Sequence, residues 1–317
     1  MNTLKRHTVG VVGTGQVGMA AAYAMFQQRA VNELVFVDVD RKRAEGEAMD
    51  LMHGQGYVGR RRVRAGGFDD LVDAQVVVIS AGVGQKPGES RLQLLRRNAE
   101  IFRELAAQLD RYAPDAILLI ATNPVDILTY LMQEYSNRSG DLIIGTGTML
   151  DTTRFRSLLA EYYSVDPRSV HAFIIGEHGD SEVPVWSTAN IAGVRLLDNA
   201  VLSKPFDRDA MAEIFHKVRN AAYQIIERKG YTNWAIGLVI AHLLRTIQDD
   251  QNSLLPVSVR LTGEYGIKDV CLSIPTAVGI NGVGYRALPA LRAEELAALR
   301  HSAEVLRRTL SDLTSAK

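Results

Sequence analysis

The chain is poor in cysteine, because Cys271 is the only one among its 317 residues. A single thiol cannot close a disulfide within the chain, and it excludes a metal site built from several thiolates. Disulfides persist mainly in oxidising compartments, so a chain without them suits the reducing cytosol. The composition therefore favours a cytoplasmic protein.

The sequence also lacks an excess of charge of either sign and a long apolar run. Thirty-six basic side chains balance thirty-six acidic ones, which argues against nucleic acid or a membrane surface as a partner. Apolar runs such as residues 116–121 have the length of a strand, far below the ~20 residues that a membrane helix requires. The basic run Arg60 to Arg64 is short and isolated, and we interpret it as a solvated loop.

A glycine-rich turn stands between an expected strand and an expected helix. The β-branched run 8–12 leads into the turn Gly13 to Gly18, and an alanine-rich stretch, 19–28, follows. A second expected strand, 34–37, ends at Asp38. This order is the dinucleotide-binding fingerprint, in which the glycines permit a tight turn and close approach of the pyrophosphate to a helix N-terminus.

The acidic residue Asp38 bears on the choice of cofactor. Its carboxylate is placed to accept hydrogen bonds from the adenosine ribose hydroxyls, and it would repel a 2′-phosphate. This favours NAD over NADP, although the nearby Arg41 and Arg43 weaken the preference.

Further short apolar runs predict the rest of the architecture. Strands are expected at 76–79, 116–121 and 142–144, with helical stretches between them. This alternation predicts an α/β fold with a Rossmann-type doubly wound parallel sheet. From about residue 147 the pattern becomes mixed, with strands near 171–175 and 257–262 and helices at 207–229 and 293–310. We therefore divide the chain into an NAD-binding domain, 1–146, and an α+β substrate-binding and catalytic domain, 147–317.

Three stretches carry polar side chains suited to chemistry. The glycine-rich segment 81–91 follows a strand at the edge where open α/β sheets bind ligands, so it is either a hinged lid or a plain surface loop. Asp151 and Arg154 share one face of a helix, as a site or as a simple ion pair, whereas Arg156 is turned by roughly 200° to another surface. In IIGEHGDSEVP an apolar run ends at a glycine and presents His178 on a turn, for catalysis or merely to water.

The chain resembles the L-lactate dehydrogenases of the bacterial type. Six motifs occur in that family's order and approximate spacing, from about Val9 to the C-terminal helix: GTGQVG, AGVGQKPGESR, ATNPVD, LDTTRFR, IIGEHGDS and KGYTNWAIG. The resemblance implies reversible, NADH-dependent reduction of pyruvate to (S)-lactate in anaerobic glycolysis or fermentation.

The resemblance also implies a role for each matching residue. His178 is the acid/base, with Asp151 as its partner, while Arg154 holds the substrate carboxylate and Arg91 polarises the ketone when the lid closes. Further substrate contacts are Gln85, Asn123 and Thr232, the last on the substrate's methyl side; the peptide bond after Asn123 is cis in relatives. The residues matching the family's NAD site are Gly13, Gly15, Val17, Gly18, Asp38, Arg43, Gly82, Val83, Thr122, Asn123 and Ile236, of which Ile236 packs on the nicotinamide ring.

Three alternatives stay open. In malate dehydrogenases an arginine takes the place of Gln85 and pairs with the second carboxylate, although Lys86 could supply a charge here. A non-catalytic NAD(H)-binding protein would be expected to lack an acid/base or clamp residue, and all of these are present. A metal site on the acidic turn 177–182 would place adjacent ligands in poor geometry, so no metal is expected.

Arg156 and His171 match a second, regulatory site of the family. In activated bacterial relatives this pair binds fructose 1,6-bisphosphate at a two-fold subunit interface. If residues 172–175 form a strand, His171 and His178 lie up to ~20 Å apart and cannot share a pocket. The resemblance thus implies a homotetramer that this sugar bisphosphate activates.

Overall fold

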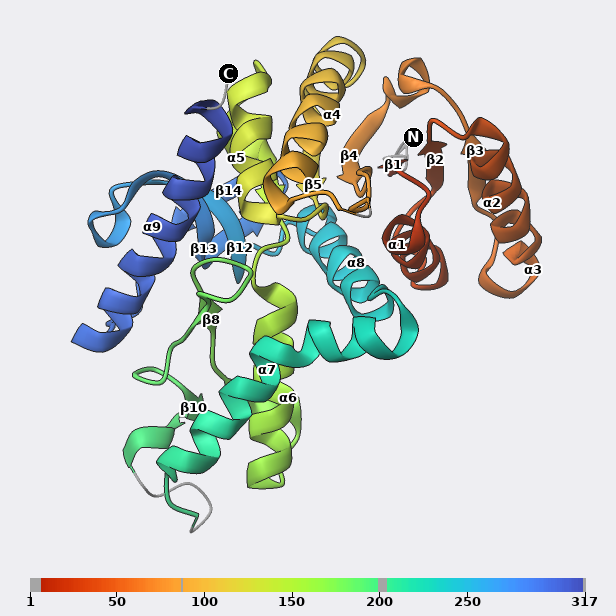
Figure 1. Cartoon of the computed structure of the whole chain (residues 1–317). Coiled ribbons are helices and arrows are strands. Elements are labelled where there is room, and N and C mark those ends of the chain that lie inside the picture. Colours follow the sequence, from red (N-terminus) through yellow and green to blue (C-terminus); the bar gives the residue numbers. More distant parts are fainter. Residues whose placement is uncertain (1–6, 87, 199–203, 316–317) are drawn as a thin grey trace.

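The computed structural model describes residues 7–86, 88–198 and 204–315, so Pro87 of the expected lid lies outside the described residues. The first half alternates strands and helices (Figure 1). Its elements are β1 (Thr8–Val12), α1 (Gln16–Gln27), β2 (Glu33–Val37), α2 (Arg41–His53), α3 (Gln55–Val58), β3 (Arg62–Ala65), η1 (Phe68–Leu71), β4 (Ala74–Ile79), α4 (Arg91–Tyr112), β5 (Ile117–Ile120), α5 (Val125–Tyr135), η2 (Gly140–Leu142) and β6 (Ile143–Gly145).

The second half mixes long helices with short strands and ends in three longer strands and a helix. Its elements are α6 (Met149–Tyr163), η3 (Pro167–Ser169), β7 (Val170–His171), β8 (Ile174–Ile175), β9 (Val183–Pro184), β10 (Asn190–Ile191), β11 (Val194–Arg195), η4 (Leu196–Asp198), α7 (Arg208–Lys229), α8 (Trp234–Gln248), β12 (Ser253–Thr262), η6 (Glu264–Gly266), β13 (Lys268–Gly279), β14 (Gly282–Arg286) and α9 (Ala293–Ser315).

One large sheet organises the molecule. In the described part of the chain its order is β14-β13-β12-β6-β5-β4-β1-β2-β3. The six strands from β6 to β3 are parallel, as the doubly wound fold predicts. β12 joins β6 in antiparallel fashion and begins a meander through β13 and β14. The sheet therefore runs through both halves of the chain and holds them together.

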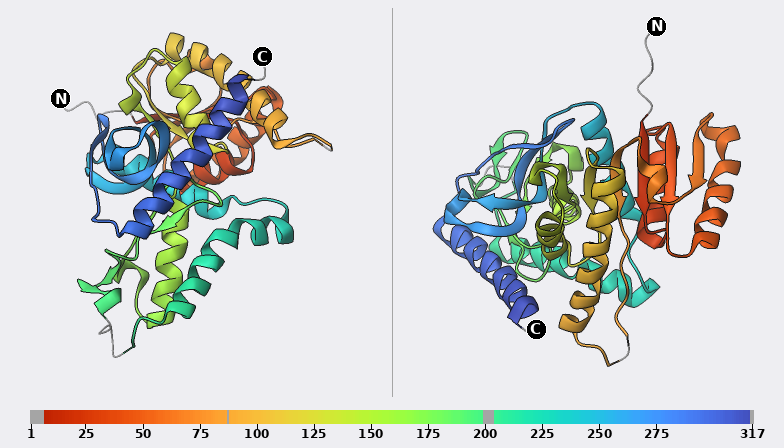
Figure 2. Two further views of the ribbon diagram at one scale, coloured as in Figure 1. Left: turned by 60° about the vertical axis from the view of Figure 1, so that its left-hand side comes forward. Right: turned by 90° about the horizontal axis from the view of Figure 1, so that it is seen from above.

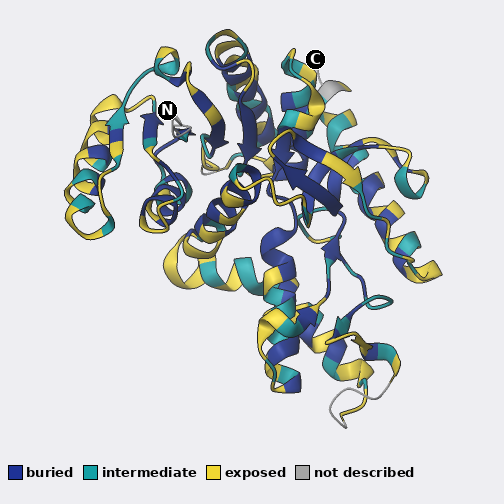
Figure 3. Ribbon diagram, turned by 180° about the vertical axis from the view of Figure 1, so that it is seen from behind, coloured by how far each residue is buried: buried dark blue, intermediate teal, exposed yellow. Residues whose placement is uncertain are grey.

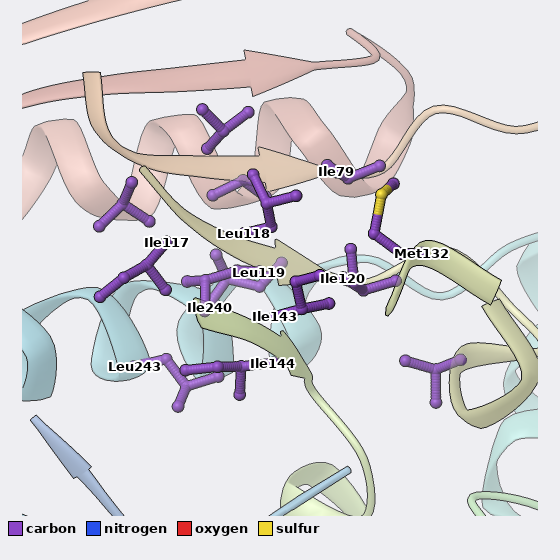
Figure 4. Packing of buried hydrophobic residues seen from close by; sticks show 14 of the residues in the cluster. Ile79, Ile117, Leu118, Leu119, Ile120, Met132, Ile143, Ile144, Ile240 and Leu243 are labelled. Carbon is purple, nitrogen blue, oxygen red and sulfur yellow. The ribbon is translucent and has the colours of Figure 1, made fainter. Parts of the chain in front are cut away.

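Helices cover both faces of the sheet, and its strands are buried (Figures 2 and 3). α1 packs against α8 and α4 packs against α5. The inner strands are almost wholly apolar because a parallel sheet covered on both faces gives them no wet side. Figure 4 shows side chains of β5 and β6 packed with Ile240 and Leu243 of α8 and with Met132 of α5, all of them buried.

A second, smaller core lies within the lower part of the molecule in Figure 1. Phe155 and Leu159 of α6, with Met211, Ile214 and Val218 of α7, form its centre. Around it β7, β10 and β11 make a small antiparallel sheet, while β8 and β9 form a hairpin. This hairpin stands between the small core and the large sheet, which is where the site is built.

One local prediction is refined and a second is wrong. Residues 171–175 are two strands, β7 and β8, because the chain leaves one small sheet at Ala172 and enters the next at Ile174, where Thr152 Oγ1 accepts the Ile174 N–H at 2.9 Å. The arginine run is not simply a loop: from Arg62 onward it forms edge strand β3, and Arg64 pairs with Glu33 at 2.8 Å and with Asp70.

Candidate active site

His178 lies on the turn between β8 and β9, and three elements hold that turn in place. Gly176 begins it with φ +89°, a conformation that favours glycine. The His178 backbone N–H donates to Asp126 Oδ2 of α5 at 2.7 Å, and the Glu177 N–H donates to Ser302 Oγ of α9 at 2.7 Å. The backbone of the turn is thus fixed by bonds to two helices, α5 and α9, that are far apart in the sequence.

The imidazole of His178 is paired with a buried carboxylate. His178 Nδ1 lies 2.5 Å from Asp151 Oδ2, and the two side chains are 24% and 4% exposed. Burial alone would lower the pKa of His178, but the carboxylates, Asp151 foremost, raise it to about 9. A carboxylate at Nδ1 fixes the tautomer and leaves Nε2 to act as an acid or a base. His178 and Asp151 therefore lie in the contact that the predicted acid/base pair requires.

Arg154 shares the same carboxylate. Its Nη1 donates to Asp151 Oδ1 at 2.9 Å across one turn of α6. Burial would raise the pKa of Asp151, but the positive charges of His178 and Arg154 hold it below its ordinary value. Asp151 thus stays ionised and joins an imidazolium to a guanidinium. Such a cluster binds an anion and gives a proton to an atom next to it.

The glycine turn after β1 fits a dinucleotide. Gly13 has φ +97°, and a Cβ there would lie 2.6 Å from the backbone nitrogen of Ala81. Gly15 has open space where a side chain would stand, and it precedes the N-terminus of α1. Val17 and Gly18 lie in the first turn of that helix, whose N–H groups suit a pyrophosphate.

Asp38 lies at the end of β2, beside this turn. Its Oδ2 accepts the backbone N–H of Thr14 at 2.6 Å and the Thr14 hydroxyl at 2.8 Å. Although burial would raise the pKa of Asp38, these bonds, the Asp40 N–H and the charge of Arg43 keep it below its ordinary value. The carboxylate stays ionised, which suits a ribose diol and opposes a 2′-phosphate.

The loops after β4 and β5 complete the cofactor side. Thr122 Oγ1 donates to the Ala81 carbonyl at 2.8 Å, and Asn98 Oδ1 accepts the Val83 N–H at 2.9 Å. A Cβ on Gly82 would lie 2.7 Å from Thr122 Cγ2, so the two loops are in close contact. The Asn123–Pro124 bond is cis, as the resemblance implied.

α8 brings two further predicted residues toward this region. Thr232 precedes the helix and Ile236 lies in its first turn, and both are partly buried. α8 packs closely on α1: a Cβ on Gly237 would lie 2.7 Å from the backbone of Ala20. The helix N-terminus that suits the pyrophosphate and the residues assigned to nicotinamide and substrate are therefore held as one unit.

The described residues of the segment 81–91, which are 81–86 and 88–91, project from the molecule (Figure 2). Gln85 and Arg91 are exposed, so they are not enclosed with His178 in this conformation. The loop is tied to α4: Glu89 pairs with Arg97 at 2.7 Å, and Arg97 Nη2 donates to the Gly84 carbonyl at 2.8 Å. Arg91 is the first residue of α4 and follows the capping residue Ser90. The roles predicted for Gln85 and Arg91 therefore stay predictions.

Arg156 and His171, the two residues that match the family's regulatory site, lie apart from His178. Arg156 Nε donates to the carbonyl of Ala172, the residue after His171, at 2.8 Å, and its guanidinium stacks on Phe173. Arg156 is partly buried, which lowers its pKa, and His171 is exposed on β7. The two side chains therefore come from neighbouring segments, as a shared site requires.

Several functional neighbours were not predicted from the sequence. Asn98, Asp126, Ser302 and Glu182 are all buried polar residues that lie around the loops just described. Asp126 was visible only as part of ATNPVD and Glu182 only as part of the acidic turn 177–182, and the other two gave no local signal. Among residues 7–86, 88–198 and 204–315, no three acidic, histidine or cysteine side chains gather in a way that could hold a metal ion.

Comparison with known proteins places the chain among dehydrogenases. The family profile for the lactate/malate dehydrogenase NAD binding domain matches residues 7–145, and that for the lactate/malate dehydrogenase alpha/beta C-terminal domain matches residues 148–316. A protein named L-lactate dehydrogenase from Salinibacter ruber is 57% identical, with 98% of this chain and 99% of the relative covered. One of that name from Gloeobacter violaceus is 49% identical, covering 96% and 92%.

A solved structure gives the same result. The ligand-bound crystal structure of the minor L-lactate dehydrogenase from Enterococcus mundtii superposes with a TM-score of 0.94, at 39% identity, covering 99% of each chain. Fold and sequence agree over the whole length of the molecule.

Proposed function

Because the chain belongs to the lactate/malate dehydrogenase family and is an NAD-dependent oxidoreductase, we propose that its site interconverts pyruvate and L-lactate. The observation that carries this proposal is the His178–Asp151–Arg154 cluster, in a chain that also has a dinucleotide-binding turn. In this cluster the buried carboxylate of Asp151 bonds both His178, a proton donor, and Arg154, which can bind a carboxylate. Reduction of a 2-oxo acid requires a proton donor for the ketone oxygen and a binding group for the carboxylate.

Each residue of the cluster has one task in the proposed reaction. Arg154 binds the substrate carboxylate, and the imidazolium of His178 donates its Nε2 proton to the ketone oxygen. Arg91, brought in when the lid closes, stabilises the negative charge that develops on that oxygen. NADH supplies the hydride for the carbonyl carbon. In the reverse direction, neutral His178 takes the hydroxyl proton of lactate.

The remaining residues orient the reactants. Asn123 bonds near the nicotinamide and the substrate oxygen, Thr232 lines the substrate's methyl side and Ile236 packs on the nicotinamide ring. Gly13, Gly15, Val17 and Gly18 would hold the pyrophosphate, and Asp38 and Arg43 would hold the adenosine ribose. Gly82, Val83 and Thr122 would also contact the cofactor. The proposed division of the chain at residues 1–146 and 147–317 puts the reaction between the two domains.

Gln85 favours pyruvate over oxaloacetate. The distal carboxylate of oxaloacetate would meet a neutral amide there, and burying an unpaired carboxylate costs several kcal/mol. Lys86, next in the chain, keeps malate dehydrogenase as the second candidate. The test is the ratio of kcat/KM for the two acids with NADH. A higher value with oxaloacetate would replace the proposal by malate dehydrogenase, and no NADH oxidation with any short 2-oxo acid would revive the non-catalytic alternative.

Fructose 1,6-bisphosphate is proposed as an activator that binds Arg156 and His171. The support is positional: Arg156 reaches the backbone next to His171, and both lie on the surface of the small core rather than at His178. Two such pairs facing each other across a two-fold axis would repel when empty and would be neutralised by the two phosphates of the sugar. Activator and assembly are thereby coupled.

A homotetramer is proposed because the described surface carries an apolar region suited to a second copy. Tyr23 of α1, Tyr57 of α3, and Trp234 and Leu238 of α8 are exposed, and three of them line a groove of about 660 Å³. Exposed apolar area of this kind marks protein interfaces. The cytoplasm is the proposed location, because Cys271 is the only cysteine. Within the described ranges no helix is long and apolar enough to cross a bilayer.

A further inference from the structure

Glu182 is a buried carboxyl group beside the His178 cluster, and the proposed reaction does not use it. It ends the turn that carries His178, directly before β9, and is 6% exposed. Among the described residues, no donor lies within hydrogen-bond distance of its Oε1. Burying a carboxylate with an unmatched oxygen is costly, so the protonated form is the one that suits this position.

The charged groups that face Glu182 come from three segments. They are Asp151 and Arg154 of α6, His178 of the turn, and Arg219 of α7. Helix α9 also packs on β9. Its own buried carboxyl, Glu295, already accepts two backbone N–H groups, at 2.9 and 2.8 Å.

Of the two neighbouring buried carboxyls, Asp151 keeps the charge and Glu182 keeps the proton. Asp151 bonds both His178 and Arg154, at 2.5 and 2.9 Å. Burial raises the pKa of Glu182 to about 8, and the charge of Asp151 adds to that rise while the surrounding cations oppose it. At neutral pH Glu182 is therefore a neutral acid on which the charge of Arg154 acts.

We propose that Glu182 is a positioning residue whose neutral carboxyl group lets Arg154 capture the substrate carboxylate. The inference rests on the proposed function, because it assumes that a carboxylate binds there. A captured carboxylate stands as a second negative charge beside Asp151. An ionised Glu182 would be a third, and it would compete for the same arginine. Loss of the Glu182 proton therefore weakens the binding of the substrate carboxylate to Arg154.

Oxamate, an unreactive isostere of pyruvate, tests this without turnover. Its Kd for the enzyme–NADH complex is measured from pH 7 to 10 in the wild type and in Glu182→Gln. Oxamate binding to the wild type requires a proton on His178 and a second proton on Glu182. A plot of the wild-type log Kd against pH should therefore approach a slope of two above pH ~9. In the variant only the His178 proton is required, so the slope should be one. At pH 9 the wild type should bind up to about ten-fold more weakly than the variant, and at pH 7 within about two-fold.

Glu227→Gln is the matched control, because it removes the same group from an exposed position on α7. It should keep the wild-type slope. A wild-type slope that stays at one overturns the proposal without need of any variant, and so does an equal slope in wild type and Glu182→Gln.

A measurement without ligand separates this inference from the proposed function. A raised carboxyl pKa gives stability that is present below the ordinary glutamate value and is lost as pH rises through about 8. The wild-type Tm should thus fall relative to that of Glu182→Gln between pH ~5 and 8. Parallel Tm curves overturn the inference. Divergent curves with no turnover of pyruvate overturn only the proposed function.

Discussion

At the scale of single residues, Asp151 sets the charge of the site because His178 and Arg154 both bond to it. Asp151→Asn keeps the shape and removes the charge, so the pKa of His178 should fall from about 9 toward the ordinary ~6.5. Pyruvate reduction needs the imidazolium, which is present below that pKa and is lost above it. The alkaline limb of pyruvate kcat/KM should therefore move to lower pH, with a loss of up to about 30-fold at pH 8.

The same substitution should move the acid limb of lactate oxidation to lower pH, since that direction needs the neutral imidazole. Unchanged circular dichroism and unchanged NADH binding would confirm an intact fold. A pH profile that coincides with the wild type in both directions would contradict the role given to Asp151.

Gln85 is the residue that we expect to decide between substrates. Gln85→Arg places a guanidinium where the distal carboxylate of oxaloacetate would lie, and it adds an unpaired charge against the methyl group of pyruvate. The ratio of kcat/KM for oxaloacetate over pyruvate should rise by about 10²-fold. Lys86→Gln serves as the control. A drop in oxaloacetate activity in that variant, with no change in Gln85→Arg, would assign the second carboxylate to Lys86 instead.

At the scale of elements, the hairpin turn depends on a helix more than a hundred residues later in the chain. Ser302→Ala removes the buried acceptor of the Glu177 N–H and leaves that donor unmatched, which costs about 1–3 kcal/mol of the free energy of unfolding. Because the turn carries His178, kcat should fall several-fold. NADH affinity should not change, since the glycine turn belongs to other elements. Urea unfolding, kcat and the NADH Kd measure these effects.

His301→Ala, at an exposed neighbouring position on α9, is the control. If both variants lose kcat equally, the helix as a whole is responsible rather than the hydrogen bond to the turn.

The elements that could be predicted are those whose signal is local. β1, β2 and β4 follow from apolar, mostly β-branched runs, since a strand buried on both faces has no polar side. The break between β7 and β8 could not be predicted, because it depends on Thr152 of α6 and on the different partner strands β10 and β9. The roles of Ser302 and Asn98 could not be predicted for the same reason. Their partners, Glu177 and Val83, are distant in the sequence, and no sequence pattern relates them.

At the scale of the whole molecule, the mixed pattern of the second half predicted neither the sheet to which β12 belongs nor its antiparallel pairing with β6. That pairing fixes the second half against the NAD-binding strands. Outside this frame lies the expected lid, whose described residues bond to α4 through the Glu89–Arg97 pair and the Gly84 carbonyl, and to the loop after β5 through Thr122. A rigid frame with such a loop suits an enzyme in which closure, rather than domain rotation, brings Arg91 to the substrate.

Activation by fructose 1,6-bisphosphate is the prediction that belongs to the whole assembly. Added activator should lower the KM for pyruvate and shift the protein toward tetramers in sedimentation, because two phosphates neutralise the facing Arg156 and His171 pairs. Arg156→Gln should abolish both effects. His171→Gln should weaken them. His216→Gln, an exposed histidine of α7, should respond as the wild type does. A KM that ignores the sugar bisphosphate in the wild type, or a response that survives both substitutions, would remove this site from the description of the enzyme.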